Sequence, residues 1–249
     1  MSKNLKNALI GYSGFIGSNL INLRKNFDLY NSKNIKKIKL KSYNSIYCAG
    51  TYSKIWLAKK NPNKDKKNLD NLISNLTKVN AKNFFLISTC EVFGKQKKTF
   101  ENLKIKENYK YTYGFNRLNL EKFIEKKFLN HFILRLPIVY GKNFSKNFLY
   151  DLINSKNLEK LNGNDTVQIY NVANLKKHLK YVEKNKIKKI NLSSKPLKIK
   201  YIAKKFFNIK LRCNKKFRVI NMKSIYGRNK GHYFLSENKT LKDLKNFLK

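Results

Sequence analysis

Near the N-terminus, a short apolar run is followed at once by three glycines spaced three residues apart and then by an apolar helical pattern. The run ends in Gly11, and the next two glycines are Gly14 and Gly17. This order predicts a strand, a tight turn and a helix, in which Gly11 allows the sharp turn and Gly17 allows close packing of the helix on the sheet. Because Gly14 has no Cβ, a pyrophosphate can approach the backbone at the helix N-terminus. A glycine-rich turn that binds nothing is the alternative.

The chain is long enough and apolar enough for one α/β unit with a small appended lobe. Of its 249 residues, 41% are hydrophobic, which suffices for a buried core. No apolar run approaches the roughly 18 residues of a membrane span. Residues 1–4 lead straight into the first expected strand, so we expect no signal peptide. The three cysteines, Cys48, Cys90 and Cys213, are far apart and suggest neither a disulfide framework nor a metal site, which favours a cytoplasmic protein.

The chain is strongly basic, with 56 lysine and arginine residues against 14 aspartate and glutamate residues and a formal charge of +42. The lysines are spread over nearly every segment, and asparagine, isoleucine, phenylalanine and tyrosine are also frequent. This pattern favours AT-rich coding and solvated faces over a dense nucleic-acid-binding stripe. The net charge still leaves a basic nucleic-acid binder as one alternative function. The same charge also attracts small anions such as a nucleotide diphosphate.

Strand-like apolar runs alternate with helical patterns through the first part of the chain, which predicts a doubly wound parallel sheet. The expected strands cover residues 8–10, 27–30, 45–50, 84–88 and 132–136, and the expected helices cover 69–79 and 113–128. Residues 61–67 are so polar that we expect a loop there, and residues 33–41 read as a basic connector.

From about residue 143 the pattern loosens into short segments. The expected strands are 167–170, 187–192 and 217–220, and the expected helices are 175–182, 199–207 and 241–248. No linker rich in glycine or proline separates the two halves. We therefore expect residues 1–142 to form a nucleotide-binding domain and residues 143–249 a smaller α/β substrate-binding lobe that is interleaved with it, with a cleft between them.

The Gly-x-x-Gly-x-x-Gly turn, with Phe15 and Ile16 between its last two glycines, resembles that of the extended short-chain dehydrogenase/reductase family. These enzymes are NAD(P)-dependent nucleotide-sugar epimerases, dehydratases and reductases. The resemblance runs over roughly residues 7 to 150 and implies a Rossmann-type fold, a bound NAD(P), a nucleotide-sugar substrate and a homodimer. Trp56-Leu57-Ala58 and Asn61-Pro62, together with Arg117 where most members have Lys, resemble a small branch of this family.

A tyrosine and an arginine one helical turn apart are the candidate proton-transfer pair. Tyr113 and Arg117 stand at i and i+4 and therefore share one face of the expected helix. The phenol needs a nearby cation to ionise near neutral pH, and Arg117 supplies that charge as well as a fork that can hold a ribose diol. Tyr109 and Tyr111 have no cation four residues later, so neither is an equivalent candidate. The alternative for the pair is a half-buried helix aromatic beside a surface charge.

The strand expected at 84–88 ends in polar residues that the resemblance places at the substrate. Thr89 matches a hydroxyl four residues before an aromatic–glycine pair, and in the family it hydrogen-bonds the reacting substrate oxygen. Glu91 matches the last residue of the dehydratase triplet Thr-Asp-Glu, but Cys90 replaces the Asp, which disfavours a dehydratase. Asn147 falls where the family often contacts the nucleotide diphosphate. A strand-end cap is the alternative role for Thr89, and a solvated loop charge is the alternative for Glu91.

The end of the second expected strand bears on the choice of cofactor. Asp28 lies inside this strand, whereas the tip is Asn31-Ser32 followed by Lys33. Enzymes that use NAD usually place an acid at this tip, so its absence favours NADP over NAD. The cofactor-binding residues that the resemblance implies are Gly11, Ser13, Gly14, Phe15, Ile16, Gly17, Asn31, Ser32, Lys33, Cys48, Ala49, Gly50, Tyr113, Arg117 and Pro137.

Three functions follow from these patterns. The first is an oxidoreductase or epimerase that passes hydride between nicotinamide and a nucleotide-activated sugar, with Thr89, Tyr113 and Arg117 as catalytic residues. The second is a non-catalytic dinucleotide-binding protein, a sensor or scaffold, which the arginine at position 117 suggests. The third is the basic nucleic-acid binder.

Overall fold

The structure of the protein is a computed structural model that describes residues 5–23, 26–52, 55–107, 110, 112–228 and 231–249. Residues 1–4, Tyr109 and Tyr111 lie outside the described residues. The chain forms two compact units. The first comprises residues 1–96, 104–135 and 174–190, and the second comprises residues 97–103, 136–173 and 191–249.

The first unit is built on a six-stranded parallel sheet, which confirms the predicted Rossmann-type fold. Its strand order is β2-β1-β3-β4-β5-β9. The strands are β1 (Asn7–Ile10), β2 (Phe27–Tyr30), β3 (Ser42–Cys48), β4 (Asn80–Thr89), β5 (His131–Leu136) and β9 (Lys189–Asn191). All of them overlap strands expected from the apolar runs, because a sheet covered on both faces requires continuous apolar strands.

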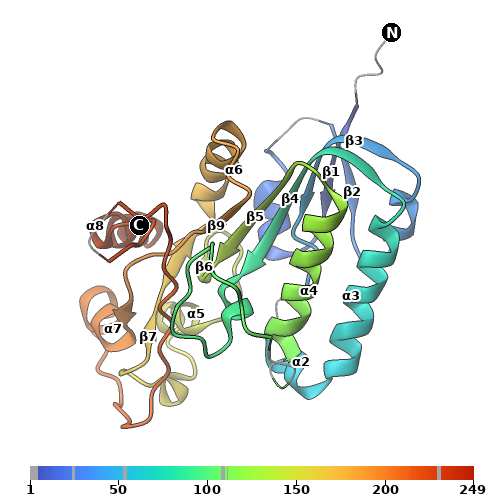
Figure 1. The fold of residues 1–249 in the computed structure, drawn as a ribbon. Helices are drawn as coiled ribbons and strands as arrows, with labels where there is room; N and C mark the ends of the chain where they lie inside the picture. The colour runs from blue at the N-terminus through green and yellow to red at the C-terminus, as the bar shows by residue number, and fades with distance from the viewer. Residues whose placement is uncertain (1–4, 24–25, 53–54, 108–109, 111, 229–230) are drawn as a thin grey trace. The chain divides into compact units, whose positions relative to one another are not determined.

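The helices of the first unit are α1 (Phe15–Leu20), α2 (Ile55–Lys60), α3 (Pro62–Leu76), α4 (Thr112–Lys127) and α6 (Leu175–Lys184). Figure 1 shows α3 and α4 side by side on one face of the sheet. The loop expected at residues 61–67 is wrong, because α3 already begins at Pro62. Proline at the first helical position and Asp65 in the first turn both favour a helix start, and they outweigh the polar composition of this stretch.

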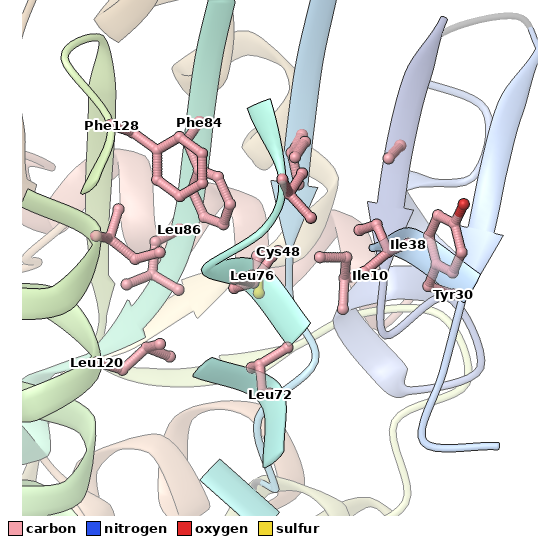
Figure 2. Close-up of a cluster of buried hydrophobic side chains, with 14 of the residues drawn as sticks. Ile10, Tyr30, Ile38, Cys48, Leu72, Leu76, Phe84, Leu86, Leu120 and Phe128 are labelled. Carbon is pink, nitrogen blue, oxygen red and sulfur yellow. The ribbon is translucent and has the colours of Figure 1, made fainter. Parts of the chain in front are cut away.

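A single apolar layer joins α3 and α4 to the sheet. Leu72 and Leu76 of α3 and Leu120 of α4 are buried in the same cluster as the β-strand residues beneath them (Figure 2). In this layer the rings of Phe84 and Phe128 stack with centroids 4.4 Å apart. Each such buried side chain contributes about 1.5–3 kcal/mol to folding, so this layer fixes the helices on the sheet.

The described residues of the second unit form two short strand pairs and three helices. Strand β6 (Ile138–Tyr140) pairs in parallel with β8 (Ile169–Asn171), and β7 (Thr166–Val167) pairs antiparallel with β10 (Leu197–Lys198). The helices are α5 (Phe148–Ile153), α7 (Ile199–Phe207) and α8 (Glu237–Phe247), and their apolar residues form a core of their own.

Two of the strands expected in this region differ from the structure. The run at 167–170 is divided into β7 and β8 at Gln168, whose buried side-chain amide hydrogen-bonds both the amide and the carbonyl of Met222. The strand expected at 217–220 is wrong, because Val219 makes only an isolated bridge to Thr166. Among the described residues, no helix has the length and apolar character needed to cross a membrane.

Candidate functional site

The strand order reverses next to β1, and this reversal creates the candidate site. The chain leaves β1 for its neighbour β2 and then returns to β3 on the other side of β1. Ligands of open α/β sheets bind at such a switch point, beyond the carboxyl ends of the strands. There the amide of Ala49, just after β3, donates to the carbonyl of Ile10 at 2.9 Å, and the amide of Gly11 donates to the carbonyl of Tyr30 at 2.7 Å.

The three glycines after β1 serve different purposes. Gly11 has φ of +87°, and a Cβ on it would lie 2.5 Å from the carbonyl oxygen of Ala49. A Cβ on Gly17 would lie 1.9 Å from the carbonyl oxygen of Gly11, so the fold itself requires both glycines. A Cβ on Gly14 would meet only the Gly11 oxygen, at an ordinary 3.4 Å. Packing of the protein therefore leaves the space beside Gly14 open.

A cavity of about 290 Å³ opens at this switch point, entirely within the first unit. Its wall contains eight of the residues expected to bind a cofactor: Gly11, Ser13, Gly14, Asn31, Ser32, Ala49, Gly50 and Arg117. It also contains residues that were not assigned to the cofactor from the sequence: Ile10, Ile35, Thr51, Tyr52, Asp65, Asn68, Leu69, Asn71 and Leu72. Most of the latter project from one face of α3. Their spacing of three and four residues is the signal that could have found them, had the polar start of α3 been recognised as helix.

Several expected cofactor residues are not part of the cavity wall. Cys48 is fully buried in the core, and burial raises the pKa of its thiol to about 11. Phe15, Ile16 and Gly17 belong to α1, where Gly17 packs against the turn. Lys33 is exposed, and its backbone amide donates to the side-chain oxygen of Asn31 at 2.9 Å.

The tip of β2 carries amides and a hydroxyl instead of an acid. The side-chain nitrogen of Asn31 donates to the hydroxyl of Tyr12 at 3.2 Å, which fixes the amide at the cavity wall. Asp28 lies three residues earlier, where it accepts from the hydroxyl of Tyr43 at 3.1 Å and pairs with Lys41 at 3.7 Å. Asp28 is therefore engaged along the strand and is not part of the cavity wall.

Tyr113 and Arg117 lie on one face of α4, as their spacing indicates. The guanidinium carbon of Arg117 is 4.2 Å from the centroid of the Tyr113 ring, and both side chains are buried. Burial raises the pKa of the Tyr113 phenol above its ordinary value. The guanidinium lowers that pKa, as expected, but Glu91 and Asp65 raise it. Burial therefore outweighs the charge of Arg117, and the pKa of Tyr113 is raised overall.

Arg117 is a buried residue with an acidic partner, not a surface charge. Its two terminal nitrogens donate to the carboxylate oxygens of Asp65 at 2.6 and 2.8 Å, and one of them also donates to the carbonyl of Tyr52 at 2.6 Å. Asn116 donates to the same carboxylate at 2.9 Å. Although burial opposes ionisation, these hydrogen bonds hold the pKa of Asp65 below its ordinary value. Nε of Arg117 has no hydrogen-bond partner among the described residues.

The end of β4 faces α4 through a short turn. The hydroxyl oxygen of Thr89 accepts from the amide of Glu91 at 3.2 Å, so Thr89 caps this turn while its own proton can still be donated. Glu91 is buried, not solvated. The neighbouring Ser88 donates to Glu121 of α4 at 2.5 Å, and Glu121 pairs with Arg135 of β5 at 2.6 Å. This buried network fixes α4 against the strand that carries Thr89.

Two expected site residues belong to the second unit. Pro137 precedes β6, and Asn147 precedes α5. The side-chain oxygen of Asn147 accepts from the amides of Leu149 and Tyr150 at 2.9 and 3.4 Å, and its nitrogen donates to the carbonyl of Val139 at 2.9 Å. Asn147 is thus the N-cap of α5, and its amide is engaged within its own unit. In the described part of the chain, no three His, Cys, Asp or Glu side chains cluster as metal ligands do.

Comparisons with known proteins agree on the fold. No family model and no curated protein matches the sequence. Among solved structures, a dTDP-4-dehydrorhamnose reductase from Clostridium acetobutylicum superposes with a TM-score of 0.71 at 16% identity, covering 98% of each chain. An NAD-dependent NDP-hexosamine 5,6-dehydratase of tunicamycin biosynthesis gives 0.70 at 14% identity over 97% of this chain and 98% of its own. The UDP-glucuronic acid 4-epimerase of Bacillus cereus, in complex with UDP-glucuronic acid and NAD, gives 0.63 at 17% identity over 86% of each chain.

Proposed function

We propose that this protein is an NAD(P)-dependent oxidoreductase or epimerase that acts on a nucleotide-activated sugar. The observation that carries the proposal is Gly14, which lines the cavity and has no Cβ although the protein's own packing leaves room for one. The fold does not require the missing Cβ at Gly14, but a bound ligand would benefit from the space. It is what a pyrophosphate needs in order to approach the turn after β1.

The other residues of the cavity suit the remaining parts of a dinucleotide. Asn31 and Ser32 at the tip of β2 offer amide and hydroxyl groups to a ribose or its phosphate, and no acid in the cavity wall on this side repels a 2′-phosphate. Ala49 and Gly50 are small enough to let the ligand cross the end of β3. The orphaned Nε of buried Arg117 is a donor for a ligand oxygen. These groups therefore fit NAD(P), with NADP favoured.

Tyr113, Thr89 and Arg117 would carry the proton part of the reaction. When bound, the nicotinamide would supply or accept hydride at a sugar carbon. Tyr113 would give or take the proton of the sugar oxygen, Thr89 would share that hydrogen bond, and Arg117 would hold the phenol by its position over the ring. The turn that Thr89 caps packs against α4, so Thr89 and Tyr113 are supplied by contacting elements.

The substrate class rests on the structural relatives. The three described above act on dTDP-, NDP- or UDP-linked sugars, according to their names, and they include a reductase, a dehydratase and an epimerase. In this chain, Cys90 stands where a dehydratase of the family has an acid. We therefore favour reduction of a keto-sugar or epimerisation over loss of water.

One observation favours a second function, non-catalytic binding of the dinucleotide. Two of the three guanidinium nitrogens of Arg117 are engaged by Asp65, and one of these also bonds the carbonyl of Tyr52. Tyr113 beside it is only 6% exposed. A sensor or scaffold would use the same cavity without turning over a substrate.

The experiment that tests the proposal is mass spectrometry of ligands that co-purify with the protein, followed by calorimetry and turnover assays with NADP, NAD and a panel of dTDP-, UDP- and GDP-sugars. We expect a dinucleotide to bind and at least one nucleotide sugar to bind in its presence. Binding of a dinucleotide without any conversion of the panel would support the sensor. Absence of dinucleotide binding would overturn both functions.

A further inference from the structure

The Asp65–Arg117 pair belongs to the cavity wall, and its guanidinium also lies over the ring of Tyr113, which is not itself among the wall residues. Asp65 reaches Arg117 from another helix, α3, and forms an ion pair with its guanidinium. The ion pair is bidentate and buried, with side-chain exposures of 3% for Arg117 and 5% for Asp65. A permanent cation next to the phenol is thus matched by an anion at hydrogen-bonding distance. Their joint charge is close to zero.

We propose that Asp65 is a positioning residue that holds Arg117 over the ring of Tyr113 and cancels its charge, so that the resting site keeps Tyr113 protonated and is set for reduction of a keto-sugar. This inference rests on the proposed function for its reaction. The charge balance itself is independent of any substrate.

Among the described residues, the charged groups that shift the pKa of Tyr113 are the cation Arg117 and two acids. From the turn after β4, Glu91 faces it, and from α3, Asp65 does; both raise the pKa of the phenol. Lys59 and Lys60 of the neighbouring α2 are exposed to solvent, where screening is strong. The one charged residue of β4, Lys82, lies near the opposite end of that strand.

A protonated tyrosine suits one direction of the chemistry. In that direction the O–H bond of Tyr113 breaks, and its proton forms a new O–H bond on the carbonyl oxygen of the sugar. Hydride from reduced nicotinamide adds to the carbonyl carbon, so the ketone becomes a secondary alcohol and the cofactor is left oxidised. The tyrosinate then recovers a proton from solvent. The reverse reaction needs a tyrosinate at the start, which a neutralised Arg117 does little to stabilise.

The test is a tyrosinate absorbance titration of the protein without cofactor or substrate. Subtracting the titration of the same protein with Tyr113→Phe added isolates Tyr113 from the other tyrosines in each case. Four further proteins are compared with the wild type: Asp65→Asn, Arg117→Gln, the double variant, and Asn116→Ser. The last variant removes a neutral donor to the same carboxylate and leaves both charges in place, so it controls for loosening of the pair.

The proposal predicts that the Tyr113 midpoint shifts in opposite directions in the two single variants Asp65→Asn and Arg117→Gln. Asp65→Asn leaves Arg117 uncompensated and should lower the Tyr113 midpoint by about one to two pH units. Arg117→Gln leaves Asp65 uncompensated and should raise it, and the double variant should return close to the wild type. Asn116→Ser should change the midpoint little. Shifts of the same sign in both single variants, or no shift in Asp65→Asn, would overturn the proposal, since a purely structural role predicts no such sign reversal.

The proposal remains testable if Asp65→Asn fails to fold. A wild-type Tyr113 midpoint below the ordinary value of about 10 would contradict the proposal. Because burial alone also raises this midpoint, support comes from a further rise in Arg117→Gln, and no rise in that variant would contradict the proposal. Because the titration involves no ligand, its outcome is separate from that of the proposed function. The expected titration with no dinucleotide binding in calorimetry would overturn the function alone.

Discussion

Asp65 and Arg117, 52 residues apart in the chain, meet in the interior through two hydrogen bonds of 2.6 and 2.8 Å. This pair ties α3 to α4 and forms part of the wall of the cavity at the switch point of the sheet. It links the stability of the first unit to the chemistry proposed for Tyr113.

The pair should contribute strongly to folding. Arg117→Ala leaves the carboxylate of Asp65 buried without its main partner, which should cost about 3–5 kcal/mol of unfolding free energy. Arg117→Lys should cost less, because it keeps the charge and one donor. The measurement is urea denaturation, with Lys122→Ala as control. Lys122 lies on the same helix and pairs with Glu107 in solvent, so its loss should cost about 1 kcal/mol or less. Equal costs for the two alanine variants would refute the prediction.

The contribution of this pair should depend on pH in one direction. Because the pKa of Asp65 is lowered in the folded protein, its stabilisation is present above the unfolded pKa of about 4 and is lost as the pH falls through the folded value. The difference in unfolding free energy between wild type and Arg117→Ala should therefore shrink below about pH 4. A difference that stays constant down to pH 2 would assign the effect to packing.

The bare backbone at Gly14 should matter for the ligand and not for the fold. Gly14→Val should fold, since its Cβ has room, but its branched side chain should abolish dinucleotide binding in calorimetry. Ser18→Val places the same side chain on the exposed side of α1 and should leave binding intact. Gly17→Ala should unfold or strongly destabilise the protein, because its Cβ would overlap the Gly11 carbonyl. Normal affinity in a folded Gly14→Val would remove the cofactor from this turn.

The tip of β2 should favour NADP over NAD. No acid of the described cavity wall lies at this tip, and Lys33 is exposed just after Asn31 and Ser32. Lys33→Glu should narrow or reverse the preference measured by calorimetry. Lys37→Glu makes the same charge change at another exposed position and should leave the ratio of the two affinities unchanged. A wild-type protein that binds NAD several-fold more tightly would contradict this expectation.

The basic surface should bind nucleic acid only weakly. Four of the 14 acidic side chains, Asp65, Glu91, Glu101 and Glu121, are buried in the described structure, so the surface is even more basic than the sequence indicates. Dispersed lysines bind phosphates without reading sequence, and such binding falls steeply with salt. Gel shifts with two unrelated DNA duplexes should therefore give equal affinities that vanish at physiological salt. Sequence-selective, salt-tolerant binding would instead favour a nucleic-acid-binding function.

The sequence was most informative where structure is determined locally. The strand, turn and helix around Gly11 follow from a short apolar run and the glycine spacing, and α7 follows from its helical periodicity. The first turn of α3 was missed because its residues are polar, and Asp65 is buried there only because Arg117 lies opposite. No local pattern reports a partner 52 residues away. The same holds for Val219, whose apolar run makes only one bridge because its partner strand is two residues long.

The cavity was likewise predictable in part. The glycines of the cavity wall and its residues after β2 and β3 follow from the motif after β1. Tyr52 lines the cavity from the loop that follows β3, and Leu69 and Leu72 line it from one face of α3, and neither contribution follows from that motif. The partners of Arg117 were not predictable either, because a charged residue at i+4 from a tyrosine has the same spacing whether it is solvated or buried. The second-unit residue Asn147 matched a family position, yet its amide caps α5.

The measurement that tests the account most directly is turnover by wild type and Tyr113→Phe on a panel of dTDP-, UDP- and GDP-linked 4-keto sugars. Reaction is followed by the absorbance of reduced nicotinamide and by NMR of the product. We expect the wild type to reduce at least one member, and Tyr113→Phe to keep its fold and its cofactor affinity but to lose about 10²–10⁴-fold in rate, as removal of a general acid typically does. An unchanged rate in Tyr113→Phe, or no reaction of the wild type with any member, would contradict the account.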